Sequence, residues 1–287
     1  MARPATRQLK LTYLTIRTAL AQGAELLERA EVGVPRLTAE VLLAHALGCD
    51  RPYFYAHPEQ ELREVEWLHY GRYLHERMAG KPTQYITKQQ EFYGRDFRVT
   101  PDVLIPRPET ELLVETVLKL RPAAGLLIDV GTGSGAIAVT LALESPASVI
   151  ATDLSAASLA VAHLNAAKLQ ASVRFIQADL LQAFSPSCAD VIVSNPPYIS
   201  PADAPSLQPE VCDWEPHLAL FADDSGLAIY QRLIPEAARV LKPGGLLALE
   251  IGFGQADAVA ALAATWTNVQ LFPDLAGIPR VLVCEKP

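Results

Sequence analysis

The chain has 287 residues, half of them hydrophobic, so it can bury a large core and form more than one compact unit. The net charge of −8 falls entirely on residues 81–287, because the first 80 residues carry ten basic and ten acidic side chains, and this distribution argues against a basic nucleic-acid-binding surface. The four scattered cysteines form no metal-binding pattern and no segment resembles a signal peptide or a membrane span, so we expect a cytoplasmic protein with buried thiols, no metal and no membrane partner.

The N-terminal part of the chain is expected to be helical. Apolar periodicity predicts helices over residues 14–30, 36–47 and 59–79, and Gly48 follows the second helix as a C-terminal stop. Four histidines in this part show no spacing typical of metal ligands. We therefore predict a small helical domain over residues 1–81 and expect it to recognise a substrate rather than to catalyse.

A segment with β-strand character follows the helical part. Alternating β-forming residues around a Gly turn predict a β-hairpin within residues 82–107, which we interpret as the connector between two domains. Pro108 fits the first turn of a helix that runs to about Leu120, because proline is favoured there and Glu109 and Glu111 suit the positive end of the helix dipole.

From Gly125 onward the pattern alternates between strands and helices, which predicts a doubly wound α/β domain over residues 108–287. We expect strands at residues 126–130, 149–152, 173–177, 190–194, 246–251, 269–272 and 280–284. We expect helices at residues 136–144, 155–169, 226–241 and 255–265.

A glycine-rich turn follows the first of these strands. Gly131-x-Gly133-x-x-Ala136 satisfies a nucleotide-binding fingerprint, and Asp153 at the end of the next strand is placed to bind ribose hydroxyls. The fingerprint suits a dehydrogenase as well as a methyltransferase. Asp129 favours the second, because a carboxylate there would oppose a pyrophosphate but attract the ammonium and sulfonium of S-adenosylmethionine. The alternative for Asp129 is a helix cap or a solvated strand end.

Asp179 and Leu180 end the third strand. The Asp179 carboxylate is placed to approach an adenine amine and Leu180 to pack on the adenine ring, whereas a helix N-cap is the structural alternative for Asp179.

The strand at residues 190–194 runs into the corner Asn195-Pro196-Pro197-Tyr198. Two consecutive prolines donate no backbone hydrogen bond, so the strand ladder must stop at Asn195. The Asn195 side chain and the Pro196 carbonyl then become neighbouring acceptors beside the Tyr198 ring. This arrangement suits a planar NH2 group, from an amide or from a base, although a plain proline turn is the structural alternative.

Five motifs in order resemble the HemK/PrmC family, whose members methylate the glutamine N5 of peptide chain release factors. They are Ile-Pro-Arg-Pro-Glu-Thr-Glu at 105–111, Gly-Thr-Gly-Ser-Gly at 131–135, Ser-Asn-Pro-Pro-Tyr-Ile at 194–199, Glu-Pro at 215–216 and Asp-Leu-Ala-Gly-Ile-Pro-Arg at 274–280. The resemblance covers nearly the whole chain. It departs from the family at Lys88, where relatives usually have Gly, and we expect this to alter the connector turn.

The resemblance implies a class I S-adenosylmethionine-dependent methyltransferase fold, with a seven-stranded sheet whose last strand is antiparallel. It implies S-adenosyl-L-methionine as cofactor, S-adenosyl-L-homocysteine as product, and a class 1 release factor as the protein partner of a monomer that binds no nucleic acid directly. The cofactor positions, with Asp179 added from the strand argument, are Gly131, Thr132, Gly133, Ser134, Gly135, Asp153, Asp179, Leu180 and Asn195. The catalytic positions, which hold the Gly-Gly-Gln glutamine, are Asn195, Pro196, Pro197 and Tyr198.

Three alternatives remain at this point. A glutamine methyltransferase of a ribosomal protein would have much the same site, an adenine amino-methyltransferase would use the same corner for a flipped base, and a nucleotide sensor would need only the glycine loop.

Residues 200–226 form a proline-containing segment without Lys or Arg. We predict that it is either a solvated loop or an acidic lip that receives a basic protein loop. Its acids are Asp203, Glu210, Asp213, Glu215, Asp223 and Asp224.

Overall fold

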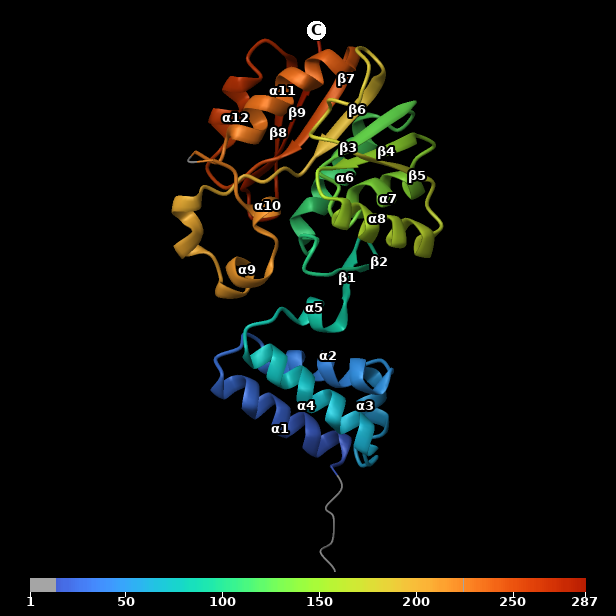
Figure 1. The fold of residues 1–287 in the computed structure, drawn as a ribbon, viewed down its shortest axis with the longest axis vertical. Coiled ribbons are helices and arrows are strands. Elements are labelled where there is room, and N and C mark those ends of the chain that lie inside the picture. Colours follow the sequence, from blue (N-terminus) through green and yellow to red (C-terminus); the bar gives the residue numbers. More distant parts are fainter. Residues whose placement is uncertain (1–13, 224) are drawn as a thin grey trace, which may run out of the picture. The chain divides into compact units, whose positions relative to one another are not determined.

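The computed structural model describes residues 14–223 and 225–287 and divides the chain into two compact units. The first unit ends at Thr87 and the second begins at Lys88 (Figure 1). Each unit has a hydrophobic core of its own, as expected for separately packed domains. The sequence placed its first boundary at Lys81 and treated residues 82–107 as a connector.

The first unit is a bundle of helices around apolar side chains that include Ile16, Leu27 and Phe54. The helices are α1 (Ile16–Arg29), α2 (Pro35–Leu47), α3 (Pro52–Ala56), α4 (Glu64–Met78) and α5 (Thr83–Thr87). Helix α2 ends at Gly48 with a φ of 67°, the left-handed stop that was predicted. The expected helix over residues 59–79 begins only at Glu64, because Glu61 forms a β-bridge with Thr15 instead.

Helix α5 lies within the range, residues 82–107, where the sequence predicted only a hairpin. The amides of Tyr85 and Ile86 donate to the Pro82 carbonyl, and both side chains are buried. Two buried residues next to each other on a strand would face opposite sides, whereas one helical turn keeps both near the same surface. The predicted range therefore contains a short helix before its hairpin.

The hairpin itself consists of β1 (Gln89–Phe92) and β2 (Arg95–Arg98), paired antiparallel. Phe92 and Phe97 are fully buried in the core of the second unit, with their rings edge to face. The hairpin thus packs as part of the α/β unit. Lys88, just before it, has a φ of 61°, so the chain keeps here the left-handed conformation that glycine adopts most easily.

The second unit is built on a seven-stranded sheet, which confirms the predicted fold class. The strands are β3 (Leu126–Val130), β4 (Ser148–Asp153), β5 (Val173–Gln177), β6 (Ala189–Ser194), β7 (Leu241–Glu250), β8 (Thr267–Pro273) and β9 (Pro279–Glu285). Their order is β5-β4-β3-β6-β7-β9-β8, and only the last strand in the sequence, β9, is antiparallel to both neighbours. The order reverses between β3 and β6, and open α/β sheets commonly bind ligands outside the carboxyl ends of the strands at such a point.

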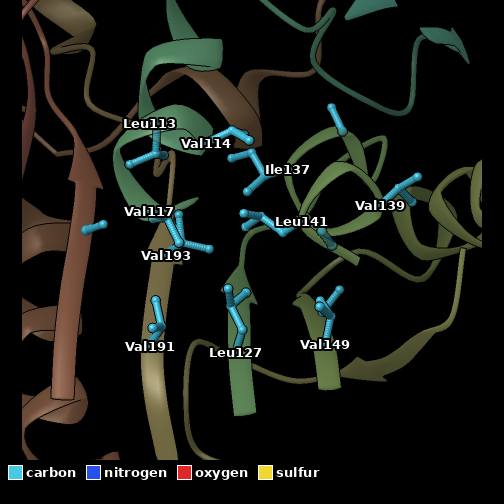
Figure 2. Packing of buried hydrophobic residues seen from close by; sticks show 14 of the residues in the cluster. Leu113, Val114, Val117, Leu127, Ile137, Val139, Leu141, Val149, Val191 and Val193 are labelled. Atoms are coloured by element: carbon cyan, nitrogen blue, oxygen red, sulfur yellow. The ribbon is translucent and has the colours of Figure 1, made fainter. Parts of the chain in front are cut away.

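Helices cover both faces of this sheet. They are α6 (Glu111–Leu120), preceded by the 3-10 turn Pro108–Thr110, then α7 (Ala136–Glu144), α8 (Ala156–Leu169), α11 (Ala228–Val240) and α12 (Ala256–Leu262). On one face, α6 and α7 pack their leucines, isoleucines and valines on alternate residues of the central strands, as Figure 2 shows for Leu127, Val149 and Val191. The other residues of the same strands meet α11 and α12. Both faces of the central parallel strands β3, β4 and β6 are buried, which explains their nearly continuous apolar sequences.

The segment between β6 and α11 is not a plain loop. It contains a 3-10 helix at Pro201–Ser206 and the short helices α9 (Pro209–Trp214) and α10 (His217–Leu220). Each begins with a proline at or beside its first turn, where the missing amide is tolerated. Three of the four prolines that suggested a loop therefore start helices, and Pro205 lies inside the 3-10 helix. Asp224, one of the predicted acids, lies outside the described residues.

Candidate active site at the carboxyl ends of the strands

The glycine loop connects β3 to α7 at the point where the strand order reverses. The amides of Gly131 and Thr132 both donate to the Thr152 carbonyl at 2.9 Å, which anchors the loop to β4. Gly131, Gly133 and Gly135 all have positive φ, between 54° and 83°. A Cβ atom on Gly131 or Gly133 would meet no atom within 4 Å, so open space borders the loop and a side chain would fill it.

Asp153 lies beside this loop, as predicted. Its Oδ2 accepts the Gly133 amide and its Oδ1 accepts the Ser155 amide, each at 2.9 Å. Burial raises the pKa of Asp153, and these backbone donors oppose the rise. The carboxylate is thus held at the mouth of the glycine loop, where a ribose bound to the loop would find its acceptor oxygens.

Asp129 makes the contacts of the structural alternative, a helix cap, and its attraction for the ammonium and sulfonium of S-adenosylmethionine stays a prediction. Its side chain is fully buried, and Oδ2 accepts the Thr132 hydroxyl at 2.6 Å and the Ala138 amide at 3.2 Å. Ala138 belongs to the first turn of α7, so the carboxyl caps that helix, and its hydrogen bond with Thr132 holds the glycine loop against the end of β3. Burial raises the pKa of Asp129 to about 7.

Asp179 and Leu180 follow β5 and lie near Asp153, because the Ala178 amide donates to the Asp153 carbonyl at 3.1 Å. The Asp179 carboxylate forms an ion pair with Arg232 at 2.6 Å, so its oxygen is already engaged and its contact with adenine stays a prediction. Leu180 is half-buried with a φ of 50°, and its carbonyl accepts the Thr152 hydroxyl. The structure therefore brings the predicted cofactor residues from β3, β4 and β5 to one edge of the sheet.

The Asn195-Pro196-Pro197-Tyr198 corner lies at the same edge, at the end of β6. The Ser194 hydroxyl donates to the Val130 carbonyl at 2.7 Å, which ties the ends of β6 and β3 together. The Asn195 Nδ2 donates to the Thr110 hydroxyl oxygen at 3.2 Å. This hydrogen bond leaves the Asn195 Oδ1 as the end of the amide without a hydrogen-bond donor among the described residues, and the buried Pro196 follows it in the chain.

Tyr198 forms the wall of the corner. Its carbonyl accepts the Gln255 Nε2 at 2.9 Å, and its ring lies so close to Gly252 that a Cβ on that glycine would come within 2.9 Å of it. Its hydroxyl makes a long contact of 3.5 Å with the Glu250 carboxylate. Burial raises the pKa of Tyr198, which therefore stays neutral at physiological pH.

Three residues at this edge were not assigned a role from the sequence: Thr110, Glu250 and Arg280. Burial raises the pKa of Glu250 to about 7, while the Thr110 hydroxyl and the Arg280 guanidinium oppose the rise. Glu250 had a detectable signal, because it is a single charged residue within the otherwise apolar stretch Leu246–Ile251. Thr110 had none, since its approach to Asn195 joins residues 85 positions apart.

Two further motifs hold the edge in place. Glu215 is buried, accepts the Ile105 amide at 3.1 Å and forms an ion pair with Arg107, so the segment that carries Thr110 is clamped to the Glu-Pro motif. Asp274 accepts the amides of Ala276 and Ile278 and the Arg280 Nε, each within 3.0 Å, which shapes the turn between β8 and β9. All five motifs recognised in the sequence thus have partners in the second unit, at or next to this edge.

Within the described ranges, no group of His, Cys, Asp and Glu side chains is arranged to hold a metal ion. Of the helices that the structure describes, none combines the length and the apolar character required to cross a bilayer.

The sheet order and the edge residues define a class I S-adenosylmethionine-dependent methyltransferase. Two family profiles match the chain, the PrmC N-terminal domain over residues 18–87 and the methyltransferase small domain over residues 108–208. The chain is 48% identical over 278 residues to a release factor glutamine methyltransferase of Koribacter versatilis, covering 96% of this chain and 99% of the relative. A second such relative, from Moorella thermoacetica, is 46% identical over 281 residues, covering 95% and 99%. The chain belongs to the HemK/PrmC family of release factor glutamine methyltransferases.

The fold is also shared with more distant proteins. A methyltransferase from Pyrococcus furiosus superimposes with a TM-score of 0.52 at 20% identity, covering 71% of this chain and 93% of that structure. At this identity the likeness concerns the fold alone.

Proposed function

We propose that the protein transfers a methyl group from S-adenosylmethionine to the side-chain amide nitrogen of the glutamine in the Gly-Gly-Gln motif of peptide chain release factors. The observation that carries this proposal is the hydrogen bond from Asn195 Nδ2 to Thr110. It turns the Asn195 Oδ1 toward the corner, where two oxygens can accept the two hydrogens of one NH2 group. The names of the relatives support the same substrate class.

The described residues fit the cofactor. Open space borders Gly131 and Gly133, the Asp153 oxygens are held at the loop, and Leu180 lies on the adjacent segment. When bound, S-adenosylmethionine supplies an electrophilic methyl group on a positively charged sulfur. We infer that the loop amides and Asp153 hold its methionine and ribose parts, and that Leu180 packs on its adenine.

The chain's part in the reaction is mainly orientation. An amide nitrogen is a weak nucleophile because its lone pair is delocalised, and acceptors fixed on both hydrogens keep that lone pair aimed at the methyl group. Pro196 and Pro197 make the corner rigid, and the Tyr198 ring excludes water from one side. The nitrogen loses a proton after transfer, and no strong base is needed for that loss, because a protonated amide is a strong acid.

We also propose roles for the flanking parts. The helical part over residues 1–81 recognises the protein substrate, residues 82–107 connect, and residues 108–287 perform the transfer. The segment after the corner receives a basic loop of the release factor. Its side chains Asp203, Asp213 and Asp223 are exposed, whereas Glu215 is withdrawn from any such surface by its ion pair with Arg107.

The test is methyl transfer from labelled S-adenosylmethionine to four acceptors: a class 1 release factor, the same factor with its Gly-Gly-Gln glutamine changed to alanine, a ribosomal-protein fraction, and DNA. We expect label on the first acceptor alone. Label on the ribosomal fraction or on DNA instead would replace the proposed substrate by the corresponding alternative, and label on the glutamine-free factor would reject the proposed acceptor atom.

A further inference from the structure

A buried carboxyl group beside the corner has no part in the reaction as derived so far. Glu250 is the last residue of β7. Ser194 of β6 pairs with Leu249 of β7, so the next residues of the two neighbouring strands, Asn195 and Glu250, lie side by side. Only 3% of Glu250 is exposed. Its Oε2 has no well-aligned donor among the described residues, although an unpaired buried carboxyl oxygen is costly. Such a group calls for a functional reason.

Thr110 connects Glu250 to Asn195. Its side chain is buried, its hydroxyl lies near enough to the Glu250 carboxyl to lower the pKa of that group, and its oxygen accepts the Asn195 Nδ2 at 3.2 Å. A hydroxyl has a single proton. When the carboxyl is ionised it can only accept, so the Thr110 proton points to Glu250 and the Thr110 oxygen remains an acceptor toward Asn195.

The direction of this chain of hydrogen bonds matters because the Asn195 amide has two different ends. With Thr110 as acceptor, Asn195 offers its Oδ1 to the substrate. With Thr110 as donor, the amide would turn over and present its own NH2 group to the substrate's NH2 group, where two sets of donors would oppose each other.

We propose that Glu250 is a positioning residue that acts through Thr110 to keep the Asn195 carbonyl oxygen, rather than its NH2 group, facing the substrate amide. The consequence for catalysis rests on the function proposed above. The contacts that join Glu250, Thr110 and Asn195 do not depend on that function, and they can be observed without any substrate.

The proposal implies a pH dependence, because only the ionised carboxyl fixes the direction. Burial raises the pKa of Glu250 to about 7; Arg280 on β9 and the Thr110 hydroxyl lower it, and the exposed Glu109 raises it. The remaining ionisable groups facing this region are Tyr198, Tyr230 and, through Tyr198, Arg107. Transfer should therefore increase as pH rises through about 7.

The kinetic test compares variants of Glu250 and Thr110. Glu250→Gln and Thr110→Val should each lower kcat/KM for a glutamine peptide roughly tenfold, the effect of about one hydrogen bond, with S-adenosylmethionine affinity unchanged. Thr110→Ser, which keeps the hydroxyl, should recover most of the rate. The matched control is Thr116→Val, the same change at a buried threonine of α6 whose hydroxyl donates only to the Leu112 carbonyl. Wild-type rates in Glu250→Gln or Thr110→Val would overturn the proposal.

The pH profile gives a readout that a merely structural role would not move. Glu109→Gln should shift the acid limb to lower pH and leave the plateau rate unchanged, because it removes a charge that raises the pKa of Glu250. Glu250→Gln should abolish the limb. An unshifted limb in Glu109→Gln, or a limb that persists in Glu250→Gln, would contradict the assignment.

A third measurement separates this inference from the proposed function. The side-chain NH2 signal of Asn195, assigned by its loss in Asn195→Asp, should move with pH around 7 in the substrate-free protein. It should stop moving in Glu250→Gln and in Thr110→Val. If this response is present but no glutamine is methylated, the proposed substrate is wrong and the positioning role of Glu250 is retained. If neither substitution changes the response of the signal to pH, the positioning role is rejected, whatever the substrate is.

Discussion

The role of Asp153 leads to a sharp prediction about cofactor affinity. Its two oxygens are held at 2.9 Å by the amides of Gly133 and Ser155, at the mouth of the glycine loop. Changing Asp153 to Ala removes the proposed acceptors of the ribose hydroxyls and also frees the Gly133 amide. Charge-assisted hydrogen bonds contribute about 1.5–3 kcal/mol each, so losing the net effect of one should raise the Kd for S-adenosylmethionine about 10-fold to 100-fold.

Isothermal titration of the cofactor measures this effect directly. Asp153→Asn, which keeps an acceptor oxygen without the charge, should fall between wild type and Asp153→Ala. The matched control is Asp190→Ala at the opposite end of the sheet, because Asp190 also accepts a backbone amide, that of Leu126 at 2.7 Å, and pairs with Lys242. The control should lose stability and keep its affinity. Unchanged cofactor affinity in Asp153→Ala would refute the placement of the ribose.

Three further predictions concern stability and association. The folded-state pKa of Asp129 is raised from 3.8 to about 7, so the stability it contributes is fully present below its unfolded pKa and is lost as pH rises to 7; the Tm of the wild type should fall across this window, and Asp129→Asn should remove on the order of 4 kcal/mol of that pH dependence. Lys88→Gly should raise the free energy of unfolding in urea by about 0.5–1 kcal/mol because of the positive φ, whereas Lys119→Gly within α6 should lower it. Neutralising the acids of the segment after the corner should slow association with a whole release factor at low salt and flatten the salt dependence of that association, while turnover of a short glutamine peptide stays unchanged. Association rates that are equal for the wild type and the variant at low salt would reject the docking role. The acids to be changed together are Asp203, Glu210 and Asp223.

Much of the fold could be predicted because its signals are local. The central strands are continuous apolar runs between turn residues. The glycine loop indicates where β3 ends, and the double proline indicates where β6 ends. The short helices α3 and α5 were missed, because five residues contain too little periodicity to distinguish a helical turn from a loop or a strand.

The site was predicted only where its residues end a strand. Asp153 is the last residue of its strand and Asn195 follows its strand directly, so the sheet order alone brings them together. Thr110 and Glu250 depend on tertiary contacts that the sequence does not encode locally, because Thr110 reaches from the start of α6 to the ends of β6 and β7. The role of Asp129 could not be decided from the sequence, because a carboxylate at a strand end can turn toward a ligand or under its own loop, and Thr132 and Ala138 offer it donors on the inner side.

The most direct test of the central claim is mass spectrometry of a release factor after incubation with S-adenosylmethionine and either the wild-type enzyme or Asn195→Ala. With the wild type, fragmentation should place one added methyl group on the side-chain nitrogen of the Gly-Gly-Gln glutamine. With Asn195→Ala, transfer should fall about 100-fold or more while cofactor affinity changes much less, because the lost oxygen serves mainly the substrate amide. A methyl group on another residue, or near-normal transfer by Asn195→Ala, would contradict the assignment of this corner as the catalytic site.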